Sequence, residues 1–356
     1  CALKGATCGV FSDGCKGTLD CGSCATGEVC IYSNTCLAVD PDGDGVSVFG
    51  EGTNFAFHAI SPFADEVSRV RIADMDGDGD LDLVGGSIGD MKVFWYEQGP
   101  EDIYVPHEIA IESGVVVELE VADLDKDGDL DILVSTHEGL NWYRNSGAGE
   151  FTVQSLLEYT SEYARYLAVG DLNNDTHMDI VTTRTLQGSN SQIIWLKNDG
   201  LQGFTETTIY THGAFAFQRL QLADFNADGA LDVVVSSRDD SQIFWLESSG
   251  DEPTFTKKPV SSALTFPSFV HAADLDKDGD MDVISSTGAK EVHLRWFEND
   301  GAQNFVLKTL DAKGACASKS DCAYGDYCVG GLCDARYDAP RNVQVDDFDG
   351  DGDNDL

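Results

Sequence analysis

Groups of aspartates recur along this chain with a spacing that suits the binding of a metal ion. Six loops share one pattern, in which positions 1, 5 and 9 are aspartates and position 3 is aspartate or asparagine. With position 7 included, the candidate ligands are Asp74, Asp76, Asp78, Asp80 and Asp82; Asp123, Asp125, Asp127, Asp129 and Asp131; Asp171, Asn173, Asp175, His177 and Asp179; Asp224, Asn226, Asp228, Ala230 and Asp232; Asp274, Asp276, Asp278, Asp280 and Asp282; and Asp347, Asp349, Asp351, Asp353 and Asp355.

Calcium is the cation that these loops favour, with one ion expected in each. Ca²⁺ takes roughly six to eight oxygen ligands in irregular geometry, whereas Mg²⁺ dehydrates reluctantly and seldom uses a cage made only of protein groups. Position 7 includes His177 and Ala230, so we expect its ligand to be the backbone carbonyl. Glycine at position 6 permits a left-handed bend in every loop but the third, which has Thr176. The alternative, six solvated acidic turns, is disfavoured because the pattern recurs in register.

The elements that position these loops are predicted to be short β-strands. The loops recur about every 50 residues, and all five tryptophans of the chain follow them at one repeat position. In one repeat we expect strands over 115–122, 130–135, 140–144 and 151–156, because these segments alternate in polarity and end at Gly, Asn or Asp. Four-stranded units at this period are typical of propeller blades.

We therefore predict an all-β fold, a calcium-binding β-propeller of six four-stranded blades over residues 40–356. The segment 46–55 fits the second half of a repeat and the last acidic loop fits the first half, so the two ends are expected to complete one blade and close the ring. The chain stops at Leu356, where a strand should begin, so we expect the natural protein to continue, and a seventh blade is allowed.

Eleven cysteines form two clusters at the edges of the repeat region. Cys-dense stretches beside a Cys-free body are typical of disulfide-stapled modules in an oxidising compartment, so we predict a secreted or extracellular protein. The expected modules span residues 1–39 and, inserted in the propeller, 312–336. Zinc is disfavoured because paired C-x2-C knuckles are absent, and Cys21–Cys24 lacks the context of a redox motif. The odd count in the first cluster predicts one thiol paired outside this sequence.

The acidic loops and the W-Y-x-N-x-G segments resemble the FG-GAP and VCBS repeat families, as in the propeller of the integrin alpha subunit. This resemblance covers about residues 46–356 and implies a calcium-bearing propeller with ligands at positions 1, 3, 5 and 9. Thr176 and His177 depart from the pattern, and Asn226 and Ala230 make the fourth loop less acidic. The cysteine clusters resemble EGF-like or similar small secreted modules, which implies pairing of Cys316 with Cys328 and of Cys322 with Cys333.

Other candidate sites have weaker signals. Asp40, Asp42, Asp44 and Glu51 fit the string of an EF-hand loop without its helices, so they form either an acidic linker or a seventh calcium site. The tryptophans are expected to pack between blades, and stacking on sugars is the alternative. The segment 85–89 matches a nucleophile elbow but leads into a strand, which argues against catalysis.

The formal charge of −41 excludes whole classes of partner. A surface this acidic repels phosphate backbones and anionic lipids, so we expect no nucleic-acid binding, and no apolar run is long enough for membrane insertion. The expected function is that of a structural or adhesive protein in a matrix, cell-surface or filament assembly, whose partners are extracellular proteins or glycans. The alternatives are a carbohydrate-binding, lectin-like propeller and, ranked last, a polysaccharide lyase with basic or Tyr and His groups in a central channel.

Overall fold

The computed structural model divides the chain into two compact units, Cys1–Ser61 and Pro62–Leu356. It describes residues 65–99, 103–147, 149–158, 163–186, 190–213, 217–249, 253–262, 264, 266–287 and 294–308, together with the backbone of six short strands outside these ranges. The described residues contain no helix with the length and hydropathy needed to cross a bilayer.

Three antiparallel hairpins lie in the cysteine-rich segments. In the first unit β1 (Val10–Ser12) pairs with β2 (Thr18–Asp20), and β3 (Glu28–Ile31) pairs with β4 (Thr35–Ala38). In the second unit β25 (Asp326–Val329) pairs with β26 (Leu332–Ala335). The register places Cys30 opposite Cys36 and Cys328 opposite Cys333. The predicted disulfides stay predictions.

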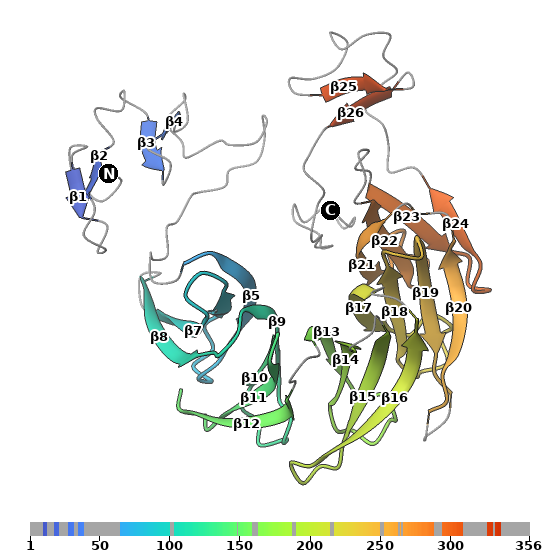
Figure 1. Ribbon diagram of the computed structural model, residues 1–356, viewed down its shortest axis with the longest axis horizontal. Helices are drawn as coiled ribbons and strands as arrows, with labels where there is room; N and C mark the ends of the chain where they lie inside the picture. The colour runs from blue at the N-terminus through green and yellow to red at the C-terminus, as the bar shows by residue number, and fades with distance from the viewer. Residues whose placement is uncertain are drawn as a thin grey trace. The chain divides into compact units, whose positions relative to one another are not determined.

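Five four-stranded antiparallel sheets make up the described repeat region, which confirms the all-β, blade-like fold (Figure 1). We number them blades 1 to 5 in chain order. Their strands are β5 (Val67–Ala73), β6 (Asp82–Ser87), β7 (Lys92–Gly99) and β8 (Ile103–Ile111); β9 (Val116–Ala122), β10 (Asp131–Thr136), β11 (Gly139–Asn145) and β12 (Phe151–Glu158); β13 (Tyr163–Gly170), β14 (Asp179–Thr185), β15 (Ser191–Asn198) and β16 (Phe204–His212); β17 (Phe217–Ala223), β18 (Asp232–Ser237), β19 (Gln242–Glu247) and β20 (Thr256–Ser261); β21 (Pro267–Ala273), β22 (Asp282–Thr287), β23 (Leu294–Asn299) and β24 (Phe305–Lys308).

The blades follow one another through their first strands. β5 contacts β9, β9 contacts β13, β13 contacts β17, and β17 contacts β21. The fourth strands are much more exposed, as in β12 and β16, while β10 and β18 in the middle of their sheets are buried along their whole length. The first strand of each blade is therefore the innermost one. The predicted sixth loop lies outside the described residues, so the total number of blades stays a prediction.

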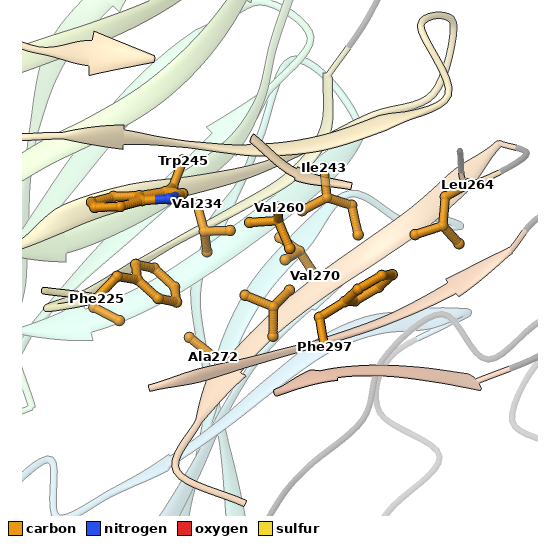
Figure 2. Close-up of a cluster of buried hydrophobic side chains, with 11 residues drawn as sticks. Phe225, Val234, Ile243, Trp245, Val260, Leu264, Val270, Ala272 and Phe297 are labelled. Carbon is orange, nitrogen blue, oxygen red and sulfur yellow. The ribbon is translucent and has the colours of Figure 1, made fainter. Parts of the chain in front are cut away.

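The core lies between successive blades rather than inside any one of them. One cluster joins Trp245 and Val234 of blade 4 to Val270 and Phe297 of blade 5 (Figure 2). Equivalent clusters join blades 1 and 2, blades 2 and 3, and blades 3 and 4. The tryptophans of blades 1 to 4 are at most 4% exposed, which confirms that they pack between blades.

Candidate metal centres

Each described acidic loop connects the innermost strand of its blade to the second strand. The position 1 aspartate shapes the turn by accepting the backbone N–H of position 6. The oxygen Oδ2 of Asp74 accepts from Gly79 at 3.0 Å, and Asp123 accepts from Gly128 at 3.1 Å. The same bond recurs at Asp171, Asp224 and Asp274. The predicted common turn is thus present in all five described loops.

Two residues in each of the five described loops adopt the left-handed conformation. At position 6, φ is +96° for Gly79 and +98° for Gly128, as expected for glycine. The third loop holds Thr176 at +74°, although a β-branched residue is strained there. Position 4 is also left-handed, with φ of +60° at Lys126. Among the five described loops only the first has glycine at position 4, so the sequence did not reveal this second bend.

The side chains at positions 1, 3 and 5 converge in the way that a cation site requires. In the first, second and fifth loops, three carboxylate oxygens lie within 4.8 Å of one another. These groups are Asp74, Asp76 and Asp78; Asp123, Asp125 and Asp127; and Asp274, Asp276 and Asp278. In the third and fourth loops the asparagine at position 3 donates to the position 5 aspartate, at 2.8 Å from Asn173 to Asp175 and 3.0 Å from Asn226 to Asp228.

Several of these oxygens are buried and lack a hydrogen-bond partner. They are Oδ1 of Asp123, Oδ1 of Asp125 and Oδ1 of Asn173. The Asp125 side chain is 4% exposed. A buried oxygen without a partner is costly, and a bound cation would satisfy it. The donor set, made of carboxylate and amide oxygens alone, fits Ca²⁺.

The position 9 aspartate closes the loop onto the third strand. It is fully buried in every described blade. In blade 2, Oδ2 of Asp131 accepts the N–H of Leu124 at 3.1 Å and Oδ1 accepts the N–H of Asn145 at 2.9 Å. Burial raises the pKa of Asp131 and Asp179 to about 6 and that of Asp232 to about 7, although backbone N–H groups oppose the change. Each oxygen retains a second lone pair, so ligation by position 9 stays a prediction.

Position 7 lies against the turn that follows the tryptophan strand. A Cβ added to Gly147 would clash with the carboxylate of Asp129, and one added to Gly200 would clash with the ring of His177. Both glycines have positive φ. Because the position 7 side chains are accommodated under these turns, their placement favours the predicted backbone-carbonyl ligand, which stays a prediction.

In blades 2, 3 and 5, the asparagine three residues after the tryptophan donates a hydrogen bond to the previous blade. Asn145 Nδ2 donates to the carbonyl of Met75 in the loop of blade 1, at 2.7 Å, and also to Leu130 in its own blade. Asn198 and Asn299 repeat this bond to Leu124 and Phe225, at 2.8 and 3.0 Å. In blade 4 the position is Ser248. We call this contact the asparagine clamp; it locks neighbouring acidic loops together.

Comparison with known proteins agrees with this repeated geometry. A family model described as the FG-GAP-like repeat matches residues 74–134, 123–182 and 224–285. The chain contains three FG-GAP-like repeats. These matched segments hold the loops at Asp74, Asp123, Asp171, Asp224 and Asp274. No curated protein matches the chain.

Among the solved structures compared with this chain, a lectin shares its fold at low identity, and two others are less similar. A lectin from Agrocybe aegerita, described as recognising non-reducing terminal N-acetylglucosamine, has a TM-score of 0.51 and 19% identity. That match covers 68% of this chain and 66% of the lectin, just under two thirds of its length. A luciferin-regenerating enzyme has a TM-score of 0.47 and 8% identity, covering 71% of this chain and 78% of the enzyme. AofleA from Arthrobotrys oligospora has a TM-score of 0.42 and 10% identity, covering 66% of this chain and 69% of that protein.

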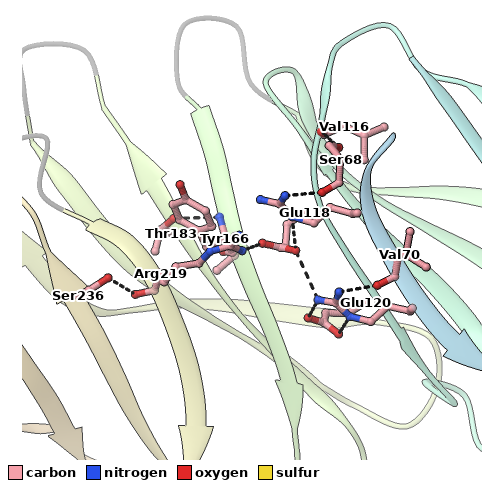
Figure 3. Close-up of polar contacts among 12 residues, drawn as sticks. Ser68, Val70, Val116, Glu118, Glu120, Tyr166, Thr183, Arg219 and Ser236 are labelled. Carbon is pink, nitrogen blue, oxygen red and sulfur yellow. Dashed lines mark hydrogen bonds and ion pairs between the residues drawn. The ribbon is translucent and has the colours of Figure 1, made fainter. Parts of the chain in front are cut away.

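The innermost strands of the FG-GAP-like repeats carry a polar cluster that sequence reasoning did not find (Figure 3). Glu118 of β9, whose side chain is 2% exposed, accepts from Arg69 of β5 at 2.8 Å and contacts Arg71 at 3.4 Å. It also contacts Arg219 of β17, whose guanidinium stacks over Tyr166 of β13. Glu120 pairs with Arg71. We call these residues the inner-strand cluster; it joins four blades.

The inner-strand cluster brings together the residue types expected in a catalytic channel, but it pairs their charges. Burial, and then the positive charges of Arg69 and Arg71, lower the pKa of Arg219 to about 9. Arg219 therefore remains protonated at neutral pH. Its contact with Glu118 makes this cluster an ion-pair network around a buried carboxylate.

Some predicted sites lie outside the described residues. They are the sixth loop from Asp347 to Asp355, the EF-hand-like string from Asp40 to Glu51, and most of the two cysteine modules. The EGF-like character of those modules stays a prediction.

Proposed function

We propose that this chain is a calcium-stabilised β-propeller that binds other macromolecules in an extracellular setting, without turnover. The observation that carries the proposal is the repeated convergence of carboxylate oxygens within 4.8 Å, in loops at the same position of blades 1, 2 and 5. One such loop would be an ordinary acidic turn. Several in register, with buried oxygens that lack partners, form a set of cation sites.

The second and third loops lie on the same side of their blades, because residues of one contact residues of the other. Lys126 of the second loop contacts Thr176 of the third, and Gln202 of blade 3 donates to Asp125 of blade 2 at 3.5 Å. The asparagine clamps link the first loop to blade 2 and the second loop to blade 3. Neutralising this acidic side would therefore act on several blades together.

The residues at positions 1, 3 and 5 would hold the ion, with position 9 and the position 7 carbonyl completing the site. Bound calcium supplies positive charge that offsets the mutual repulsion of the carboxylates. Since it binds the folded loops and not the unfolded chain, it stabilises the fold by mass action. The chain's own residues preorganise the oxygens through the N–H bonds to positions 1, 5 and 9.

The pairing of the polar groups supports a binding role without catalysis. The aspartates serve repeated loops, and the inner-strand cluster neutralises its own arginines through Glu118. No unpaired combination of acid and base stands out among the described residues. The cysteine modules and the outer strands remain as surfaces for extracellular proteins or glycans, as expected of a structural or adhesive component.

Glycan binding is the second candidate, supported by the fold shared with the Agrocybe aegerita lectin. The tryptophans of blades 1 to 4 are buried and offer no face to a sugar. Recognition of a glycan, such as one ending in N-acetylglucosamine, would therefore use loops and exposed aromatics. Phe266, which is 42% exposed and lies under Arg238, is one such side chain.

Thermal unfolding with and without calcium tests the proposal. We expect calcium-free protein to melt many degrees lower than protein in millimolar calcium, with magnesium restoring little. A glycan array and a screen on acidic polysaccharides, each run in calcium, then separate the roles. Glycan retention without turnover supports the lectin-like form, and turnover abolished by one side-chain change refutes the non-catalytic one. Unchanged melting after calcium removal refutes the structural role of calcium.

A further inference from the structure

At one position beside each described acidic loop, the side chain is negatively charged in some blades and positively charged in others. It is the second residue after the tryptophan, on the third strand, and it is Glu97, Arg144, Lys197, Glu247 and Glu298 in blades 1 to 5. The strand pairing places all five equivalently: Arg144 pairs with Thr152 of the fourth strand, and Lys197 pairs with Thr205. We call it the flanking position.

Contacts show that the flanking position reaches the ligand side chains. In blade 2, Arg144 Nε contacts Oδ2 of Asp125, and its Nη2 lies 3.6 Å from Oδ2 of Asp127. In blade 4, Asn226 Nδ2 lies 3.4 Å from Oε1 of Glu247. The side chain at this position therefore touches positions 3 and 5 of its loop.

We infer that Arg144 makes the second loop a weaker calcium site than the first and fifth loops, which offer the same three converging aspartates. This rests on the proposed calcium binding. Arg144 places one positive charge on two of the three converging carboxylates, whereas blades 1 and 5 place a glutamate at the same position. A cation held within about 4 to 6 Å of a divalent ion repels it strongly at the intermediate dielectric of a protein surface.

The second loop nevertheless keeps the features of a metal site. Oδ1 of Asp123 and Oδ1 of Asp125 are buried without partners, and the Asp125 side chain is 4% exposed. Arg144 uses the other oxygen of Asp125, and its side chain is 39% exposed, so it can turn toward solvent. Arg144 is thus an internal counter-ion that calcium must compete with, and not a replacement for the site.

The loop also offers a matched control. Lys126 stands at position 4 of the same loop and carries the same charge, but it contacts Thr176 of the next loop. Removing Lys126 changes the net charge by as much as removing Arg144. Only removal of Arg144 frees the ligand carboxylates.

Calcium titration by calorimetry of the whole chain tests the inference, comparing the parent protein with Arg144→Gln, Arg144→Glu and Lys126→Gln. We expect Arg144→Gln to tighten calcium binding at the second loop at least tenfold and Arg144→Glu to tighten it further, with Lys126→Gln changing it by less than threefold. Adding Asp127→Asn to Arg144→Gln should abolish the gain and so locate it in this loop. Calcium-free melting temperature gives a second readout, which Arg144→Gln should lower.

The outcomes separate the inference from the function beneath it. Calcium binding that Arg144→Gln leaves unchanged or weakens refutes the inference alone, as does an equal gain from Lys126→Gln. A parent protein that binds no calcium refutes the proposed function and the inference with it. A gain with Arg144→Gln that Asp127→Asn does not remove places the weak site elsewhere and overturns the assignment.

Discussion

Replacing Asn198 with alanine should loosen the contact between blades 2 and 3. Its side chain is 1% exposed and makes three hydrogen bonds. It donates to the carbonyls of Leu124 and Met178 at 2.8 and 3.0 Å, and it accepts the N–H of Gly200 at 3.0 Å. Each such bond contributes about 1 kcal/mol, and a buried carbonyl left without a partner costs about 1 to 3 kcal/mol. We expect the free energy of unfolding to fall by about 2 to 4 kcal/mol.

Blade 4 supplies the matched control for this change. Ser248 occupies the clamp position, is 1% exposed, and its hydroxyl has no hydrogen-bond partner. Ser248→Ala therefore removes a similar buried site without breaking a bond, and its effect should stay below about 1 kcal/mol.

Scanning calorimetry in saturating calcium measures both variants. A loss of about 2 to 4 kcal/mol corresponds to a melting temperature lowered by roughly 4 to 10 °C in a domain of this size. Chemical denaturation followed by tryptophan fluorescence gives an independent value, since Trp195 lies between blades 3 and 4. If Asn198→Ala costs no more than Ser248→Ala, the clamp does not hold the blades together and the hydrogen-bond argument fails.

Three further predictions test other contacts. Burial raises the pKa of Asp131 to about 6 and that of Asp232 to about 7, so the folded state favours the protonated form of both acids. The stability that this protonation contributes is full below about pH 4 and is lost as the pH rises through about 6 to 7. Dialysed, calcium-free protein should therefore melt higher at pH 5 than at pH 7.5, while calcium-saturated protein should melt lower because protons compete with the metal; parallel pH profiles would contradict this. Glu118→Gln should cost about 3 to 5 kcal/mol in urea unfolding because it removes the buried carboxylate that partly buried guanidinium groups share. Glu120→Gln, at a site 27% exposed, should cost less, and equal losses would contradict a network centred on a buried carboxylate. In the Lys126→Gln background, which already lacks the contact with Thr176, Thr176→Gly should raise the melting temperature by relieving about 1 kcal/mol of left-handed strain; an unchanged or lower melting temperature would contradict the strain argument.

The strands could be predicted because the repeat provides several independent copies of the same signal. The expected segments 130–135 and 151–156 agree within two residues with β10 (Asp131–Thr136) and β12 (Phe151–Glu158). Alternating polarity marks strands that are half buried, and the tryptophan at one repeat position marks the contact between blades. Each blade faces the same neighbours, so the same pattern had to recur.

The acidic loops were equally predictable from the sequence, but the contacts made by their individual positions were not. Position 9 was expected to act as a ligand, and the structure adds that Asp131 accepts the N–H groups of Leu124 and Asn145. Asn145 lies 14 residues away in sequence and reaches Asp131 only after β10 and β11 have paired. Local spacing reports what one turn can do, and it cannot report which later strand completes that turn.

Contacts between repeats were the least accessible to sequence reasoning. The clamp asparagine recurs in the sequence, but its acceptor belongs to the preceding repeat, 70 residues away for Asn145 and Met75. Arg219 and Glu118 are 101 residues apart and meet only because the innermost strands gather. The same argument explains why departures from the repeat are informative. Where the fold holds equivalent residues in equivalent places, a change such as serine at the clamp or arginine at the flanking position alters one local interaction within a fixed geometry. Its consequence can then be measured against the neighbouring blade, which serves as the unaltered copy.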